Sequence, residues 1–144
     1  MKPVLALVIT TFFALPVVAQ PVLSPRLDVL LPESGEMGLS QFLWKKRLLV
    51  IFSDSPGDPR FIEQMSLLET RIEDLVDRDV VLLIDTNPAD MSALREKFRP
   101  RGFMLVLVGK DGSVYLRKPL LWDVREISRS IDKMPMRRQE MRND

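Results

Sequence analysis

Hydrophobic positions in the middle of the chain change their spacing from one segment to the next. Residues 47–52 and 80–84 are short, nearly continuous apolar runs, typical of strands that are covered on both faces of a sheet. After each run, apolar residues recur at helical spacing, first within residues 59–78 and then within residues 87–98. Two consecutive strand and helix units predict parallel strands, because a right-handed crossover of this length returns each helix to the sheet.

Sequence signals also mark where the helices begin and end. Asp58 and Asn87 each precede a proline, so a side-chain acceptor is followed by a residue suited to the first helical position. Asp123 and Glu126 form a capping pair at the start of the last predicted helix, which we expect to end at Pro135. The pattern therefore predicts a helix after each of the first two strands and one more near the C-terminus.

A β-hairpin is predicted between the second and last helices. Residues 103–108 are apolar, residues 109–112 form a Gly-Lys-Asp-Gly turn, and residues 113–118 alternate apolar and polar side chains. In the second of these strands we expect Val114 and Leu116 to face the core. The complete order of elements resembles the thioredoxin core, so we expect one α/β domain with a thioredoxin-like mixed sheet and helices on both faces.

The first residues have the pattern of an export signal. Lys2 provides a short positive start, residues 4–15 are mostly apolar, and Val17 and Ala19 occupy the two positions that a signal peptidase reads. Residues 1–19 are therefore predicted to be a cleaved signal peptide of a periplasmic or secreted protein with no membrane span after cleavage. An uncleaved anchor is the alternative, but the apolar run is shorter than the roughly 20 residues that a spanning helix needs.

Proline and glycine are frequent in the segment that follows the predicted signal peptide. Residues 20–38 contain three prolines and two glycines, a composition that favours an extended lead-in. We expect residues 39–46 to form one or two helical turns beside the first strand, with Trp44 as an anchor. The thioredoxin-like domain is thus predicted to span residues 39–144 and to end in a basic, methionine-containing tail.

The charges of the chain are balanced. Its 144 residues include 21 basic and 20 acidic residues. Removal of residues 1–19 takes away Lys2 and no acidic residue, so the mature chain is neutral overall. A neutral chain offers no electrostatic basis for bulk binding to nucleic acid, and we expect no nucleic-acid partner.

The chain contains neither cysteine nor histidine. In a thioredoxin-like arrangement the reactive thiols follow the first strand, but residues 53–59 here read Ser-Asp-Ser-Pro-Gly-Asp-Pro. Without a thiolate, dithiol exchange and peroxide reduction by a cysteine are excluded. The absence of histidine also removes the commonest proton shuttle and a common zinc ligand. Whether the protein is an enzyme of another kind stays open, and no cofactor is expected.

Four short segments resemble a more specific family. They are the Trp-Lys-Lys-Arg entry to the first strand at residues 44–47, Arg78-Asp79 at the exit of the first long helix, the glycine turn at residues 109–112, and residues 131–141 in the tail. Over residues 39–142 the chain resembles the bacterial family catalogued as domain of unknown function 4174, whose thioredoxin-like domain is also similar to modules in secreted animal matrix proteins. The chain departs from redox-active thioredoxins before the third strand. Phe103 and Met104 stand at the position where those thioredoxins carry a cis-proline.

Three carboxylates lie at the predicted carboxyl ends of neighbouring strands. Asp54 and Asp58 flank the turn after the first strand, and Asp85 ends the second, at the edge where ligands of open α/β sheets usually bind. Together they could surround a hard cation such as calcium, although their spacing matches no EF-hand loop. The interpretation we favour is that Asp54 stabilises the turn and Asp58 caps the helix. Asp54 and Asp85 are the candidate ligand-binding residues at this edge.

The tail combines methionines with arginines. Met134, Met136 and Met141 are of a residue type that binds the soft cuprous ion in exported proteins, but methionine also fills apolar gaps, which is the interpretation we favour. Arg137 and Arg138 are candidate ligand-binding residues, because guanidinium groups recognise carboxylates and phosphates. Local neutralisation of these arginines by neighbouring acidic residues is the alternative.

Taken with the missing thiols, these patterns favour an exported, non-catalytic thioredoxin-like module. We expect it to bind an unknown envelope protein or a small ligand through the carboxyl-end turns, the basic tail, or both. The alternative is a cysteine-independent enzyme or metal-handling protein of the cell envelope that uses carboxylates, arginines and methionines. A measurement of metal content on the purified protein discriminates between these two hypotheses.

Overall fold

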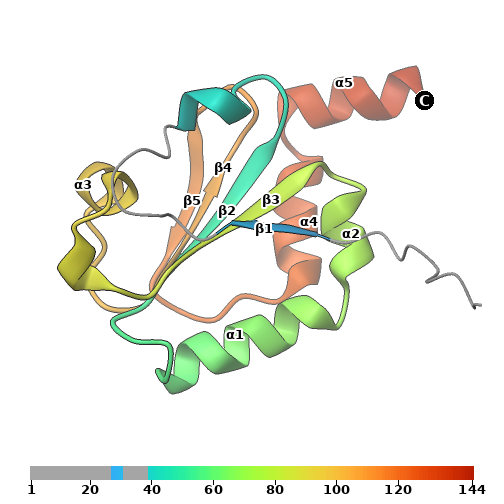
Figure 1. Ribbon diagram of the computed structural model, residues 1–144. Coiled ribbons are helices and arrows are strands. Elements are labelled where there is room, and N and C mark those ends of the chain that lie inside the picture. Colours follow the sequence, from blue (N-terminus) through green and yellow to red (C-terminus); the bar gives the residue numbers. More distant parts are fainter. Residues whose placement is uncertain (1–26, 31–38) are drawn as a thin grey trace, which may run out of the picture.

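The computed structural model describes residues 27–30 and 39–144 (Figure 1). The predicted signal peptide, residues 1–19, lies outside the described residues, and so does most of the predicted lead-in, residues 20–38. None of the helices in the described part of the chain combines the length and the apolar character needed to cross a membrane.

The strands form one mixed five-stranded sheet in the order β1-β3-β2-β4-β5. They are β1 (Asp28–Leu30), β2 (Arg47–Phe52), β3 (Val80–Asp85), β4 (Met104–Val108) and β5 (Val114–Lys118). β1 and β2 both pair in parallel with β3, whereas β4 is antiparallel to β2 and β5 is antiparallel to β4. The predicted parallel strands and hairpin are therefore present, and β1 adds an edge strand within the segment expected to be only an extended lead-in.

Helices cover both faces of this sheet (Figure 1). They are η1 (Leu39–Phe42), α1 (Pro59–Glu69), α2 (Ile72–Val76), η2 (Pro88–Asp90), α3 (Ala93–Phe98), α4 (Val124–Asp132) and α5 (Pro135–Asn143). α1, α2 and α4 contribute to the apolar core on one face, while α3 and η1 contribute to the core on the other. The predicted fold class, a thioredoxin-like α/β sheet with helices on both faces, is confirmed.

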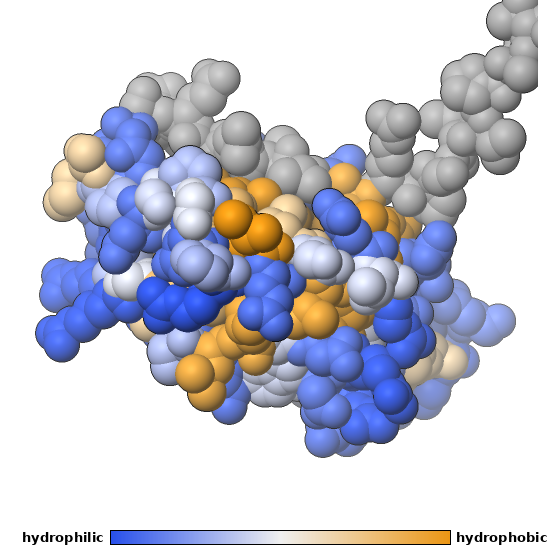
Figure 2. Space-filling model, turned by 90° about the horizontal axis from the view of Figure 1, so that it is seen from below, coloured by the Kyte–Doolittle hydropathy of each residue, from blue (hydrophilic) through white to orange (hydrophobic). Residues whose placement is uncertain are grey.

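Alternate residues of the central strands supply the two apolar cores. Leu49 and Ile51 of β2 belong to the core beneath α1, α2 and α4, whereas Leu48 and Val50 belong to the core beneath α3. All residues of β2 and β3 are buried, as the continuous apolar pattern predicts. Seen from the side of α1, apolar side chains are visible in the middle of a largely polar surface (Figure 2).

The first predicted helix is divided in two. α1 ends at Glu69 and α2 begins at Ile72, because Arg71 leaves the helical conformation with φ −146° and ψ 49°. Leu68 of α1 and Leu75 of α2 still enter the same apolar core. The predicted apolar face is therefore present, but the prediction of one continuous helix over residues 59–78 is wrong.

The second predicted helix begins later than expected. Asn87 caps only the short η2, where its side chain accepts a hydrogen bond from the Ala89 N–H at 3.3 Å. Met91 then adopts a left-handed conformation with φ 45° and is 65% exposed. Ser92 caps α3 by accepting a hydrogen bond from the Arg95 N–H at 3.2 Å. The prediction of a single helix that begins at Asn87 is therefore wrong.

Three other residues have roles that differ from those predicted. Trp44 is 63% exposed and is not an anchor, whereas Phe42 packs against the core in its neighbourhood. Val114 is 44% exposed, because the strand register shifts beside the hairpin turn. Pro135 ends α4 but also starts α5, since a residue without an N–H is tolerated in the first helical turn.

Asp58 caps α1, as predicted. Its carboxylate accepts a hydrogen bond from the Arg60 N–H at 2.9 Å, and Pro59 occupies the first helical position. Replacing Asp58 with alanine leaves that N–H without its partner, so we expect the midpoint of thermal unfolding to fall by a few degrees. Glu63→Ala, at an exposed position within α1, is the control and should leave the midpoint nearly unchanged. Equal midpoints for the two variants would contradict the capping role.

Candidate functional site

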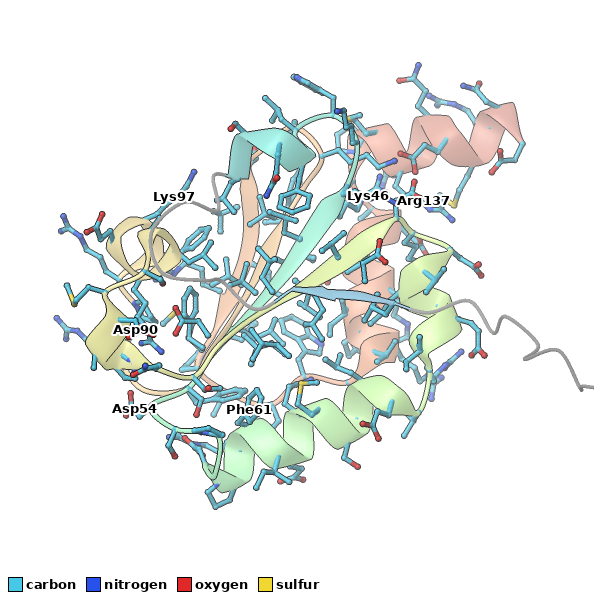
Figure 3. The ribbon with its side chains drawn as sticks, viewed as in Figure 1. Lys46, Asp54, Phe61, Asp90, Lys97 and Arg137 are labelled. Carbon is cyan, nitrogen blue, oxygen red and sulfur yellow. The ribbon has the colours of Figure 1, made fainter. Side chains whose placement is uncertain are left out.

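A cluster of charged side chains joins α5 to the amino end of β2. Glu140 accepts hydrogen bonds from the Arg47 guanidinium at 3.1 and 3.2 Å and from Lys110 Nζ at 2.7 Å. Arg137 lies one turn earlier on α5, where α5 meets the body of the domain (Figure 3). Its Nη1 is 3.4 Å from the Glu140 carboxylate. Arg47 is completely buried, so its charge depends on this carboxylate for compensation.

The pKa of Glu140 reflects two opposing influences. Burial raises the pKa, but hydrogen bonds and charge interactions with Lys110 and Arg47 outweigh burial and lower it from 4.5 to about 2. Glu140 is therefore ionised at neutral pH, where its negative charge compensates the two cations.

Two further carboxylates extend this cluster. Asp132, at the end of α4, accepts two hydrogen bonds from Arg78 at 2.9 Å and lies 3.4 Å from Arg137 Nε. The hydrogen bond from Arg78 is the main reason that the pKa of Asp132 is lowered. Asp79 accepts a hydrogen bond from Lys110 at 2.8 Å. We name the whole set the α5 ion-pair cluster; it consists of Arg47, Arg78, Asp79, Lys110, Asp132, Arg137 and Glu140.

The α5 ion-pair cluster gives α5 an inner face and an outer face. Arg137 lies on the inner face, where its side chain is only 14% exposed. Arg138, Met141 and Arg142 are exposed and follow the i, i+3, i+4 spacing of one helix face, which is the outer face. The two arginines predicted to bind a ligand thus lie in different surroundings: Arg137 is held by carboxylates of the protein itself, and Arg138 faces solvent.

The three methionines of the tail also differ in their surroundings. Met134 is 3% exposed and belongs to the same apolar core as Ile127 and Ile131 of α4. Met136 is partly buried, while Met141 is 45% exposed on the outer face of α5. Packing, the interpretation favoured from the sequence, therefore describes Met134.

At the carboxyl end of the strands, Asp85 takes part in a buried polar cluster. Asp85 is 5% exposed, and its carboxylate accepts hydrogen bonds from Arg95 Nε at 2.9 Å and from the Ser92 hydroxyl. Arg95 Nη2 also donates to the Ser53 carbonyl at 2.8 Å. The guanidinium of Arg95 lies 5.5 Å over the ring of Phe52. These contacts connect the ends of β2 and β3 to the start of α3.

The structure places Asp54 and Asp85 in different surroundings. Asp54 is exposed on the turn after β2, whereas the Asp85 carboxylate is buried and engaged by Arg95. Across residues 27–30 and 39–144, no three acidic side chains gather as they would around a metal ion. The ligand-binding roles of Asp54 and Asp85 stay predictions, and the two residues lie in separate environments.

Arg60 is a polar residue at this end of the sheet that the sequence pattern did not single out. Its guanidinium lies 5.7 Å over the ring of the buried Phe103 and pairs with Asp58 at 3.2 Å. A Cβ on Gly102, which has φ 63°, would lie 3.9 Å from both Arg60 Nη2 and Asp54 Oδ2. Asp54 and Arg60 therefore lie beside Gly102, and Asp58 is joined to them through Arg60. The sequence offered one signal for Arg60, because it lies two residues after Asp58, the predicted cap of this helix.

The family model described as Domain of unknown function (DUF4174) matches residues 38–140, most of the chain. The chain belongs to this family. The segments from residue 44 to residue 141 that suggested the resemblance all fall within or next to the matched range, so the predicted membership in DUF4174 is confirmed.

A curated relative of this DUF4174 chain is Coiled-coil domain-containing protein 80 from Danio rerio. The two sequences are 29% identical over 140 residues, which cover 76% of this chain. The match covers only 16% of the relative, so the chain spans a small part of that protein's length.

Solved structures with a similar fold include peroxiredoxins of Plasmodium species. Plasmodium yoelii Prx1a modified at the N-terminus is 21% identical, with a TM-score of 0.54, and the match covers 76% of this chain and 84% of that one. Reduced 2-Cys peroxiredoxin from Plasmodium vivax is 17% identical, with a TM-score of 0.53, and the match covers 74% of this chain and 86% of that one. At these identities the similarity establishes the thioredoxin-like fold of the DUF4174 domain.

Proposed function

We propose that this DUF4174 domain is an exported, non-catalytic binding module whose recognition surface is the outer face of α5. The observation that carries the proposal is the division of α5 into two faces with opposite environments. None of its residues is buried, and its inner face is attached to the body through the α5 ion-pair cluster. The outer face presents Arg138, Met141 and Arg142 to solvent.

The chemistry of this outer face suits an anionic partner. Arginine offers planar, bidentate hydrogen bonding to a carboxylate or phosphate, and methionine supplies an adaptable apolar contact beside it. The attachment of Glu140 to Arg47 and Lys110 fixes the orientation of α5, so the helix that carries Arg138 and Arg142 is positioned before a ligand arrives. An acidic envelope protein, or a small ligand with an anionic group, is therefore the proposed partner.

Export and the absence of catalysis are part of the same proposal. Export rests on the signal-peptide pattern of residues 1–19, and we propose a periplasmic or secreted location. The non-catalytic assignment is supported by the turn after β2, where Asp58 caps a helix and no thiol is present.

The test is a double substitution, Arg138→Ala with Arg142→Ala, compared with the wild-type protein in capture of partners from the native envelope. Loss of two charge-assisted hydrogen-bonding groups should weaken capture at least about tenfold. Thermal unfolding should stay unchanged, because both side chains are exposed. The control, Lys97→Ala with Arg101→Ala, removes the same charge from exposed positions elsewhere. Equal capture by the two double variants would disprove recognition through α5.

Arg137 requires its own variant, because it contacts Asp132 and Glu140 within the α5 ion-pair cluster. If Arg137→Ala no longer captures envelope partners and its thermal unfolding midpoint is unchanged, the predicted ligand contact is supported. If the midpoint falls and capture is retained, Arg137 serves only to attach α5 to the domain.

A further inference from the structure

A second arginine-rich region lies between α2 and α4, away from the outer face of α5. It is a polar hollow of about 270 Å³, which we name the arginine hollow; its lining residues are Arg71, Asp74, Arg78, Arg125, Ser128, Arg129 and Asp132. Four arginines therefore face two aspartates in this lining. Arg129 is also paired with Glu126 at 3.0 Å, so the lining arginines exceed the carboxylates paired with them by one.

The arginines of the hollow are unequally compensated. Arg78 is held by two hydrogen bonds to Asp132, so its charge is neutralised locally. Arg71 pairs with Asp74 at 2.6 Å, but the Arg71 side chain is 47% exposed, and pairs of this kind are weak and readily rearranged. Arg125 has no ion-pair partner within residues 27–30 and 39–144, so at least one guanidinium is uncompensated.

Ser128 provides an independent observation that indicates a ligand. It lines the hollow, its residue is only 6% exposed, and its hydroxyl has no hydrogen-bond partner in the described structure. A buried hydroxyl without a partner is unfavourable unless another group supplies a hydrogen bond. An oxygen atom seated in the hollow can accept that hydrogen bond.

We propose that the arginine hollow binds a tetrahedral oxyanion, either free phosphate or sulfate or the terminal phosphate of a small monoester. Arg125 and Arg129 lie four residues apart on α4 and therefore project from the same side of the helix. Arg71 stands opposite them, at the start of α2. Guanidinium groups from two helices can share the oxygens of one tetrahedral anion, while the Ser128 hydroxyl donates to it from within the hollow.

The proposal is tested on the purified protein by NMR titration at low salt with inorganic phosphate, inorganic sulfate and phosphoserine. We expect saturable shifts at the amides of α2 and α4, together with a shift at the Ser128 amide. Arg125→Ala with Arg129→Ala should weaken binding at least tenfold. Ser128→Ala should weaken it several-fold, because only the hydroxyl donor is removed.

The control variant is Lys97→Ala with Arg101→Ala, which removes the same charge from exposed positions outside both the hollow and the outer face of α5. Its oxyanion-induced shifts at the amides of α2 and α4 should match those of the wild-type protein, and this readout is independent of the proposed function of α5. Tighter binding of phosphoserine assigns a monoester ligand, and tighter binding of phosphate or sulfate assigns a free oxyanion; both support the hollow. Absence of saturable shifts, or equal weakening by the two double variants, would overturn the proposal.

Discussion

Replacing Glu140 with alanine is expected to lower the free energy of unfolding by about 3–5 kcal/mol, as the loss of one partner of a buried ion pair does. The reason is the environment of Arg47, which is 0% exposed and donates hydrogen bonds to both carboxylate oxygens of Glu140. Without Glu140, the buried guanidinium keeps only its hydrogen bond to the Arg78 carbonyl at 2.9 Å. Lys110 loses its 2.7 Å partner in the same substitution.

Urea unfolding of the wild type and the variant measures this effect. Glu126→Ala is the matched control, because Glu126 pairs with Arg129 at 3.0 Å while both side chains are more than half exposed. Such a surface pair contributes about 0.5 kcal/mol or less. Among the described residues the Glu126 side chain makes no hydrogen bond to Asp123, so Asp123 caps α4 without the predicted partner. If Glu140→Ala were no more destabilising than Glu126→Ala, the α5 ion-pair cluster would not stabilise the fold.

The contribution of Glu140 should also depend on pH in a defined direction. Its pKa is lowered from 4.5 to about 2 in the folded protein, so the folded state binds the proton less tightly than the unfolded state. The stabilisation is therefore present above about pH 4.5 and is lost as the pH falls toward 2. The difference in unfolding free energy between wild type and Glu140→Ala should shrink across that window. A difference that stays constant down to pH 2 would contradict the lowered pKa.

The strands that could be predicted from the sequence are those in which every residue is buried. β2 and β3 are covered on both faces, so each reads as an uninterrupted apolar run whatever packs against it. β1 has three residues and lies in a proline-rich segment, and it is defined by its parallel pairing with Val81, Leu82 and Leu83. Such pairing is a contact between distant parts of the chain, so the local periodicity of hydrophobic residues does not predict it.

Helix boundaries were predicted where a side chain fixes them locally. Asp58 and Asp123 both accept a hydrogen bond from an N–H two residues later, and both were identified from the sequence. Met91 and Arg71 instead interrupt helices through backbone conformations that neither residue type specifies. Pro135 was ambiguous for a similar reason, because proline suits both the end of one helix and the first turn of the next.

The charged clusters were the least predictable feature, because their members are far apart in sequence. Arg47 and Glu140 are separated by 93 residues, and the local pattern of neither residue indicated the other. Arg47 was placed in the buried strand over residues 47–52, but an arginine is rarely fully buried without a partner, and the pattern did not indicate that partner. Arg95 offered no signal of its burial, as it follows ordinary helical spacing in α3.

Replacing Asp85 with alanine is expected to have an effect similar in size to that of Glu140→Ala, a loss of about 3–5 kcal/mol in the free energy of unfolding. Arg95 is 9% exposed and donates to Asp85 Oδ1 at 2.9 Å, so the substitution leaves a buried guanidinium without its carboxylate. The remaining acceptors of Arg95 are backbone carbonyls, including that of Ser53. These neutral groups compensate a charge less well than a carboxylate does.

A paired substitution separates this structural role from the ligand-binding role predicted for Asp85. Asp85→Ala and Arg95→Met should each destabilise the fold, whereas the double variant should recover part of the loss, because no unpaired charge then stays buried. Asp90→Ala, at an exposed position near the same turn, should change stability by less than about 0.5 kcal/mol. Urea unfolding of the wild type, the two single variants and the double variant gives the coupling between Asp85 and Arg95 directly. Unchanged stability in Asp85→Ala, accompanied by loss of a bound partner, would instead identify Asp85 as a ligand-binding residue.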